Sequence, residues 1–219
     1  MDKVINLVNF AGWSFLLFHV TISLLIDPHA FRTADITIDV YALAAIQLFQ
    51  ILDIVLILMG KSKGSLVGSF FQILGRITVA LFYVSPDTDR LSFALMVIMW
   101  GIADINRYLY YLVKIRITAV LRYNCFLVLY PLGVYGEMRV INDYIKRNAE
   151  TISYEMIMFT RFAQAMIVLG MLFLYNYMLG SRKRMVAKNY GFDQNGEQNE
   201  EIKSRPRSPK PKRDWLSYK

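Results

Sequence analysis

Histidine, cysteine and charged residues are scarce in this sequence. Two of its 219 residues are histidines (His19 and His29), one is a cysteine (Cys125), and 19% are charged. A single cysteine excludes an internal disulfide framework, and so small a supply of ligands speaks against a zinc site or a histidine-based triad. We therefore expect neither a bound metal nor a cofactor.

Apolar residues are abundant, as the low content of charged residues suggests. They make up 55% of the chain and the mean hydropathy is positive, whereas ordinary soluble domains are about one quarter charged. Six apolar blocks are each long enough for a helix across a hydrocarbon core of about 30 Å, and none alternates with the period of two typical of barrel strands. We predict an all-α membrane protein in which six transmembrane helices form a bundle, at about 4–26, 41–59, 66–84, 91–113, 122–141 and 156–179.

Basic residues between these blocks set the orientation. Lys3, Lys61 and Lys63 fall on the same side as the basic tail, while acidic residues dilute the few basic ones on the other side. The positive-inside rule then places both termini in the cytosol.

The last forty residues form that basic tail. It holds 11 of the 25 basic residues, 5 acidic residues and three prolines, a composition that predicts disorder. It either adheres to anionic lipid or only anchors the last helix, and we expect no nucleic-acid partner because the charge follows the membrane topology. The predicted domains are 1–179, transmembrane, and 180–219, a disordered cytosolic tail.

Polar side chains recur on one face of several predicted helices. An ionisable group at the bilayer centre costs about 2.5–3.5 kcal/mol, so each needs a partner or a function. Gln72 and Arg76 are one turn apart in the third helix, and Asp104 and Arg107 are one turn apart in the fourth. We expect the bundle to enclose a polar-lined cavity; the alternative is that these charges, with Asp53 and Glu137, are buried ion pairs that fix helix register.

The fifth block has features that a simple membrane span does not need. Pro131 predicts a kink just after Tyr130, and Gly133 and Gly136 leave room for another group against the backbone. Tyr130 and Glu137 are two turns apart on one face, about 10.5 Å along the axis. A phenol and a carboxyl on either side of a cavity predict acid–base chemistry without a metal.

The residues around this block resemble a known family. LRYNCFLVLYPLGVYGE (121–137) is similar to the signature of the very-long-chain 3-hydroxyacyl-CoA dehydratases, also called protein tyrosine phosphatase-like proteins, with its Tyr-Pro-x-Gly-x-x-x-Glu pattern. WGIADINRY (100–108) resembles the family's Trp-x-x-x-Glu-x-x-Arg-Tyr motif. Asp104 replaces the usual glutamate, and Leu56 stands where many members have a histidine. The resemblance covers about residues 4–185.

The resemblance implies dehydration of long- and very-long-chain (3R)-3-hydroxyacyl-CoA to trans-2-enoyl-CoA, the third step of fatty-acid elongation. Glu137 is the candidate base for the C2 proton, and Tyr130, a phenol protonated at pH 7, is the candidate acid for the C3 hydroxyl; the reverse assignment also fits. Arg76, Arg107 and Asn124 are candidate donors to the thioester oxygen. The supporting residues are expected to be Arg76, Asp104, Arg107, Tyr108, Arg122, Tyr123, Asn124 and Gly133.

The same resemblance implies partners and a location. A long-chain acyl-CoA would be the substrate, with CoA at the cytosolic face and its acyl chain sheltered in the bundle. Membrane lipid, an elongase, a ketoacyl-CoA reductase and an enoyl-CoA reductase would be partners in the endoplasmic reticulum membrane. A catalytically inactive scaffold of the elongation complex is the alternative function. Transport is disfavoured because only one helix is broken by proline and glycine.

The candidates to bind the CoA phosphates are Lys61, Lys63, Lys114, Arg116 and Arg122.

Phosphatase activity is not predicted, despite the family's second name. Tyrosine phosphatases need Cys-x5-Arg, in which the arginine grips the phosphoryl oxygens. Cys125 is followed by Pro131 at that spacing, and proline has no donor to offer.

Overall fold

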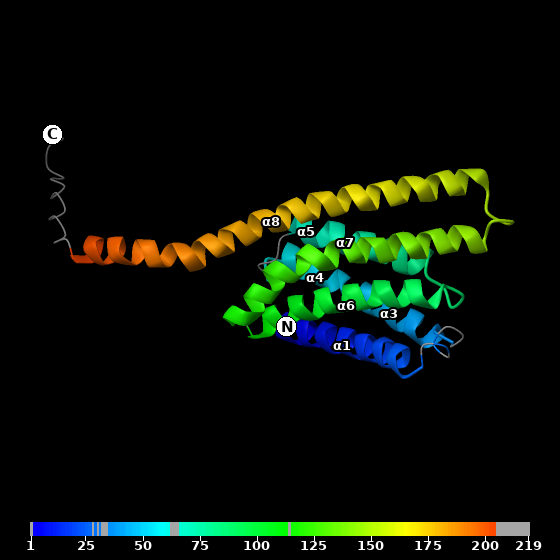
Figure 1. Ribbon diagram of the computed structural model, residues 1–219, viewed down its shortest axis with the longest axis horizontal. Coiled ribbons are helices and arrows are strands. Elements are labelled where there is room, and N and C mark those ends of the chain that lie inside the picture. The colour runs from blue at the N-terminus through cyan, green and yellow to red at the C-terminus, as the bar shows by residue number, and fades with distance from the viewer. Residues whose placement is uncertain are drawn as a thin grey trace, which may run out of the picture. The chain divides into compact units, whose positions relative to one another are not determined.

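The computed structural model describes residues 2–204 except 28, 30, 32–34, 62–65 and 114. In this part of the chain all regular structure is helical, which confirms the predicted all-α class (Figure 1). The chain divides into two compact units, Met1–Gly180 and Ser181–Lys219, and the functional groups discussed below belong to the first. The helices are α1 (Asp2–Ile26), α3 (Thr37–Phe49), α4 (Ile51–Leu58), α5 (Leu66–Phe82), α6 (Arg90–Val113), α7 (Arg116–Arg147) and α8 (Tyr154–Ser204).

Four helical segments are long and apolar enough to cross a membrane, by length and composition. The apolar part of α5, Gly68–Phe82, is shorter, and α6 contains Asp104 and Arg107, which lower its hydropathy. The chain is thus a membrane protein by its apolar helices, while the complete six-helix arrangement and the cytosolic termini stay predictions. The four segments are Lys3–Ile26, Thr37–Leu58, Ile117–Arg147 and Tyr154–Lys183.

Several helix limits differ from those expected from hydropathy. The second block is two helices, α3 and α4, joined at Gln50, whose backbone N–H still reaches the Ile46 carbonyl at 3.0 Å. The fifth block is longer at both ends, because polar residues beyond the apolar stretch continue the helix. α8 runs through Ser204, past the expected start of a disordered tail at residue 180. The chain has no proline between Pro131 and Pro206 to end the helix earlier.

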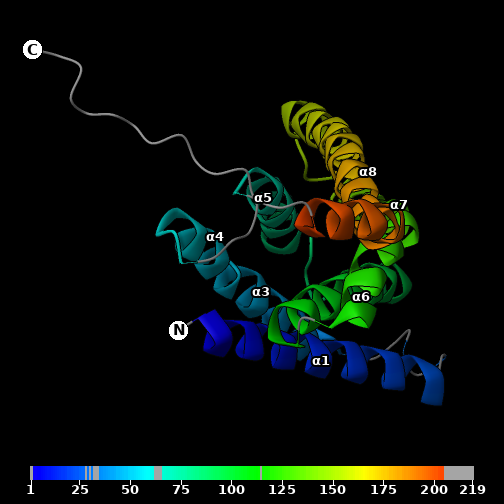
Figure 2. The same ribbon diagram turned by 90° about the vertical axis from the view of Figure 1, so that its left-hand side faces the viewer.

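α6 lies between α1 and α7 and packs closely against both (Figure 1). On the α1 side, a Cβ added at Gly101 would lie 3.3 Å from the Leu17 side chain; on the α7 side, one added at Gly136 would lie 3.0 Å from the Met96 backbone. Glycine at these positions therefore allows the close approach of the helices. Figures 1 and 2 both place α5 and the first part of α8 on the side of the bundle away from α1.

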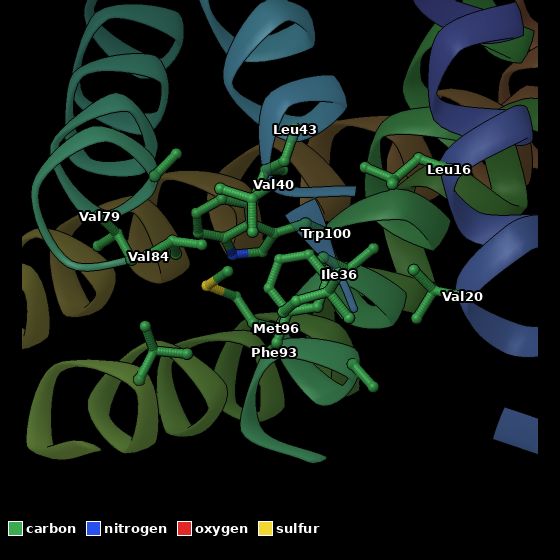
Figure 3. Close-up of a cluster of buried hydrophobic side chains, with 14 of the residues drawn as sticks. Leu16, Val20, Ile36, Val40, Leu43, Val79, Val84, Phe93, Met96 and Trp100 are labelled. Carbon is green, nitrogen blue, oxygen red and sulfur yellow. The ribbon is translucent and has the colours of Figure 1, made fainter. Parts of the chain in front are cut away.

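The core is formed mainly by the inner faces of α1, α3, α5 and α6. Figure 3 shows the Trp100 indole among these side chains, with Met96 and Phe93 of the same helix close by. All three are buried. The core thus packs around α6, and the Trp100 indole of α6 also reaches α7.

Candidate active site

Tyr130 and Glu137 lie on α7, which stays helical through Pro131. Proline has no N–H, so the Leu127 carbonyl loses its usual helical donor one turn before the proline. The helical spacing brings both side chains to the same cavity, as their separation of seven residues predicts.

That cavity, here called the apolar cavity, has a volume of about 500 Å³. Its walls come from α5, α6, α7 and α8, and most of its lining is hydrocarbon. Among its polar lining groups are Gln72, Arg76, Tyr130 and Glu137. An apolar chamber with a few converging polar groups is the usual form of a ligand site.

A second, smaller cavity of about 80 Å³, here called the polar cavity, shares part of its wall with the first. Tyr130 and Gln72 line both cavities, so the phenol of Tyr130 stands at their junction. The polar cavity is also lined by Ser69, Asn106, Arg107, Tyr111, Arg122 and Cys125.

Glu137 is almost fully buried and is held by Trp100. The indole Nε1–H of Trp100 donates to Glu137 Oε1 at 2.8 Å, and Glu137 is 8% exposed. This hydrogen bond fixes one carboxyl oxygen, while Glu137 still lines the apolar cavity. The Arg76 guanidinium lies 5.0 Å from the centre of the Trp100 ring and brings positive charge to the same wall.

Six other polar residues form what we call the buried ion cluster. Asp104 Oδ2 accepts from Arg76 Nη1 at 2.6 Å and from Gln50 Nε2 at 2.7 Å, and Asp104 Oδ1 lies 3.5 Å from Arg107 Nη2. Tyr108 donates to Asp53 Oδ2 at 2.6 Å and accepts from Arg107 at the same distance. The members of the cluster are Gln50, Asp53, Arg76, Asp104, Arg107 and Tyr108.

The buried ion cluster therefore makes the ion pairs of our alternative interpretation for Asp53 and Asp104, whereas Glu137 forms no ion pair among the described residues. Arg76 and Arg107 belong to the cluster and also line a cavity. Each guanidinium has five N–H donors. A guanidinium that is paired with a carboxylate therefore still has N–H groups that can donate to a substrate oxygen.

The remaining predicted site residues are distributed unevenly. Arg122 lines the polar cavity, with its guanidinium 4.9 and 4.8 Å from the centres of the Tyr110 and Tyr111 rings, and Gly133 lines the apolar cavity. Asn124 donates to the Val120 carbonyl of its own helix at 2.7 Å and does not line either described cavity. The Tyr123 and Arg116 side chains and the residues Lys63 and Lys114 lie outside the described part of the structure.

Two glycines of α7 behave differently from each other. A Cβ added at Gly133 would make ordinary contact with Trp100 at 3.7 Å, whereas one at Gly136 would clash with the Met96 backbone. The expectation that these glycines leave room for another group against the backbone is confirmed at Gly136, where that group is the Met96 backbone of α6, and at Gly133 the Trp100 side chain lies at ordinary contact distance.

The contribution of Trp100 was the main functional feature missed from the sequence. Trp100 begins the WGIADINRY segment that carries the family resemblance, but nothing in that segment predicts a hydrogen bond from its indole to Glu137. The contribution of α8 was also missed. Ala163 and Gly170, seven residues apart, lie on the face of α8 that lines the apolar cavity, and this spacing of small residues was the available signal.

Comparison with known proteins decides the family. The family model described as protein tyrosine phosphatase-like protein, PTPLA, matches residues 47–188. The chain belongs to this family. All the residues that line the two cavities, on α5, α6, α7 and α8, fall within the matched residues. The candidate site therefore lies within the matched region.

Curated relatives of the chain carry enzyme names. It is 22% identical to the very-long-chain (3R)-3-hydroxyacyl-CoA dehydratase hpo-8 of Caenorhabditis elegans, over 83% of this chain and 92% of the relative. It is 29% identical to the very-long-chain (3R)-3-hydroxyacyl-CoA dehydratase PASTICCINO 2 of Arabidopsis thaliana, over 84% and 91%. Its identity to dehydratase 1 of Canis lupus familiaris is 26%, over 64% of each chain. No solved structure matches the chain.

The surroundings of Cys125 differ from those of a phosphatase nucleophile. Cys125 lies inside α7, and the five residues after it are helical, so they do not form a loop around a phosphate. Within the described residues we find no group of three or more His, Cys, Asp or Glu side chains that could hold a metal ion. The absence of a cofactor stays a prediction.

Proposed function

We propose that this protein removes water from long- and very-long-chain (3R)-3-hydroxyacyl-CoA to give trans-2-enoyl-CoA. The observation that carries this proposal is that Tyr130 and Glu137 line one apolar cavity in a chain related over most of its length to proteins named as dehydratases. An apolar chamber with one phenol and one carboxyl fits an acyl substrate that must lose a proton and a hydroxyl.

The two groups divide the proton transfers between them. A base takes the proton from C2, the electrons of that C–H bond form the C2–C3 double bond, and the C3–O bond breaks. An acid gives its proton to the departing hydroxyl, which leaves as water. We assign the base to Glu137, whose carboxyl Trp100 orients, and the acid to Tyr130.

The basic groups around the cavities suit the rest of the substrate. Negative charge develops on the thioester oxygen when C2 loses its proton, and donors aimed at that oxygen lower the barrier. Arg76 lines the apolar cavity and Arg107 the polar cavity, so we assign this role to Arg76 first and Arg107 second. Arg122, in the polar cavity, faces the CoA end.

The cellular setting follows from the same assignment. A dehydratase of elongation takes its substrate from a ketoacyl-CoA reductase and passes its product to an enoyl-CoA reductase. We propose that the protein lies in the endoplasmic reticulum membrane with both termini in the cytosol, beside the elongase and these reductases.

A direct assay of wild type and two variants tests the function. Purified protein in detergent micelles receives a long-chain 3-hydroxyacyl-CoA, and enoyl-CoA formation is followed. We expect kcat to fall about 10²- to 10⁴-fold in Glu137→Gln and in Tyr130→Phe, because general acid–base catalysis contributes about that much.

The chain offers matched controls for both substitutions. Tyr135→Phe changes an exposed tyrosine of α7, and Glu155→Gln changes an exposed glutamate of α8; neither residue lines the apolar or the polar cavity. Both controls should keep wild-type turnover. A folded wild type without turnover on any chain length would contradict the enzyme assignment in favour of a scaffold.

A further inference from the structure

The walls of the apolar cavity are not equally closed. The side chains that line it from α6 and α7 are buried or half-buried. Five apolar residues that line it from α5 and α8 are instead between 49% and 58% exposed. A side chain that both lines a cavity and is exposed outside lies at the rim of an opening. We call this the α5–α8 opening, and its rim residues are Phe71, Leu74, Met166, Leu169 and Phe173.

Glycines lie on both sides of this opening. Gly75 of α5 and Gly170 of α8 line the cavity, and a Cβ added at either would meet no heavy atom within 4 Å. The helices approach each other through the rings of Phe71 and Phe173, whose centres are 5.8 Å apart. At both glycines the space next to the backbone is therefore not filled by any described residue.

The length of the cavity is short for a very long acyl chain. Its lining on α8 extends from Ala163 to Leu174, which is about 16 Å of helix at 1.5 Å per residue. An extended chain of about twenty carbons measures about 25 Å, because each carbon–carbon bond of about 1.5 Å advances the chain by about 1.3 Å. Such a chain extends beyond the cavity.

The ends of the cavity do not suit hydrocarbon. Beyond Glu137 and Ala163, the Asn142 side-chain oxygen accepts from Arg161 at 2.6 Å and from Gln164 at 3.2 Å, which ties α7 to α8 through polar groups. At the other end lies the polar cavity. The rim of the α5–α8 opening is apolar throughout, and it faces outward from apolar helices.

We propose that the α5–α8 opening is a portal through which the distal part of the acyl chain leaves the cavity and lies in membrane lipid. This inference rests on the proposed dehydratase function and adds that the cavity holds only the reactive end and the first part of the chain. The substrate class that follows is acyl-CoA without an upper limit of chain length set by the cavity.

Photo-cross-linking tests where the end of the chain lies. Wild-type protein in lipid nanodiscs receives 3-hydroxyacyl-CoA of about ten or about twenty-two carbons, lengths that are shorter and longer than the cavity, each with a diazirine at the terminal carbon. We expect the long probe to label the rim residues and the short probe to label the inner wall on α6 and α7. Labelling of the inner wall by both probes would overturn the portal.

Filling the opening gives an independent test. Leucine at either glycine, Gly75→Leu or Gly170→Leu, should lower kcat/KM for the long substrate about tenfold relative to the short one. Gly180→Leu is the matched control, because an added Cβ there also meets nothing within 4 Å and the residue does not line the described cavities. Equal losses for both substrates, or no loss for either, would contradict the portal.

The two proposals fail in different ways. Cross-linking reports binding and does not require turnover, so its result stands even if the enzyme assignment is wrong. If the protein turns over both substrates and both probes label the inner wall, the dehydratase proposal is retained and the portal is excluded. Absence of turnover with rim labelling by the long probe would exclude the dehydratase and retain a lipid-open acyl site.

Discussion

Two regions of the molecule that each contain a buried carboxyl group differ in the number of polar partners that the carboxyl has. In the buried ion cluster, Asp104 is completely buried and meets Gln50, Arg76 and Arg107. Glu137 is almost as deeply buried, yet its side chain makes a single hydrogen bond among the described residues, to Trp100. Both carboxyls are kept from bulk water, but only the first is surrounded by partners.

This difference separates a carboxyl held in an ion cluster from the carboxyl that we propose as the base. A buried charge with several partners is costly to disturb and has little freedom to exchange a proton. A buried carboxyl with one partner and a cavity beside it is available to a substrate. The contrast predicts that substitutions in the cluster affect stability first, whereas substitutions around Glu137 affect turnover first.

Removing Asp104 should give the largest effect on stability. Asp104→Ala leaves Arg76 buried without its nearest carboxylate, and loss of one partner of a buried pair costs about 3–5 kcal/mol. Denaturant titration in mixed micelles would measure the free energy of unfolding. Glu137→Gln and the exposed-site control Asp87→Ala should each change it by less than about 1 kcal/mol. Equal losses in Asp104→Ala and Glu137→Gln would break the comparison.

Substituting Trp100 should give the next effect, on turnover. Trp100→Phe removes the N–H that holds Glu137, and a hydrogen bond to a charged group is worth about 1.5–3 kcal/mol. We expect kcat to fall about 10- to 100-fold with little change in KM. Trp13→Phe is the control, since Trp13 is also buried but its N–H has no partner in the described structure. Wild-type kcat in Trp100→Phe would show that Glu137 is held by other means.

The two glycines of α7 should sharpen the comparison with the smallest effects. Gly136→Ala forces α6 and α7 apart at Met96 and should cost about 1–3 kcal/mol of unfolding free energy, as overpacking does. Gly133→Ala faces only ordinary contact with Trp100 and should be neutral or stabilising by up to about 1 kcal/mol, from helix propensity. The same denaturant titration checks both, and a reversed order would mean that α6 and α7 pack differently.

The sequence predicted which segments are helical better than it predicted the residues at which the helices begin and end. The first block, 4–26, nearly coincides with α1 because one apolar run ends in a polar loop. The expected helix 122–141 is shorter than α7, because residues such as Lys146 and Arg147 are helical without being apolar. Hydropathy detects burial in lipid, whereas the helix continues wherever its backbone hydrogen bonds do.

The residue types of the candidate site were predicted on α5, α6 and α7, where Arg76, Arg107 and Tyr130 line the cavities, but contacts were predicted only within α7. The spacing of Tyr130 and Glu137 places them on one face through local geometry, and both line the apolar cavity. The hydrogen bond from Trp100 to Glu137 depends on how α6 packs on α7, and that register is fixed by Gly136 and Met96. The pairing of Asp104 with Gln50 joins residues 54 apart in the chain. Such contacts need the tertiary structure.

The placement of Tyr130 and Glu137 on the same helix has a consequence for how the protein tolerates its surroundings. Their separation is set by the rise of α7 and not by the distance between two helices. Tilting of α5 or α8 would alter the walls of the apolar cavity, whereas the separation of Tyr130 and Glu137 depends on α7 alone. Pro131 lies between the two residues, so the local backbone of α7, and not the packing of other helices, sets how the proposed acid and base are placed relative to each other.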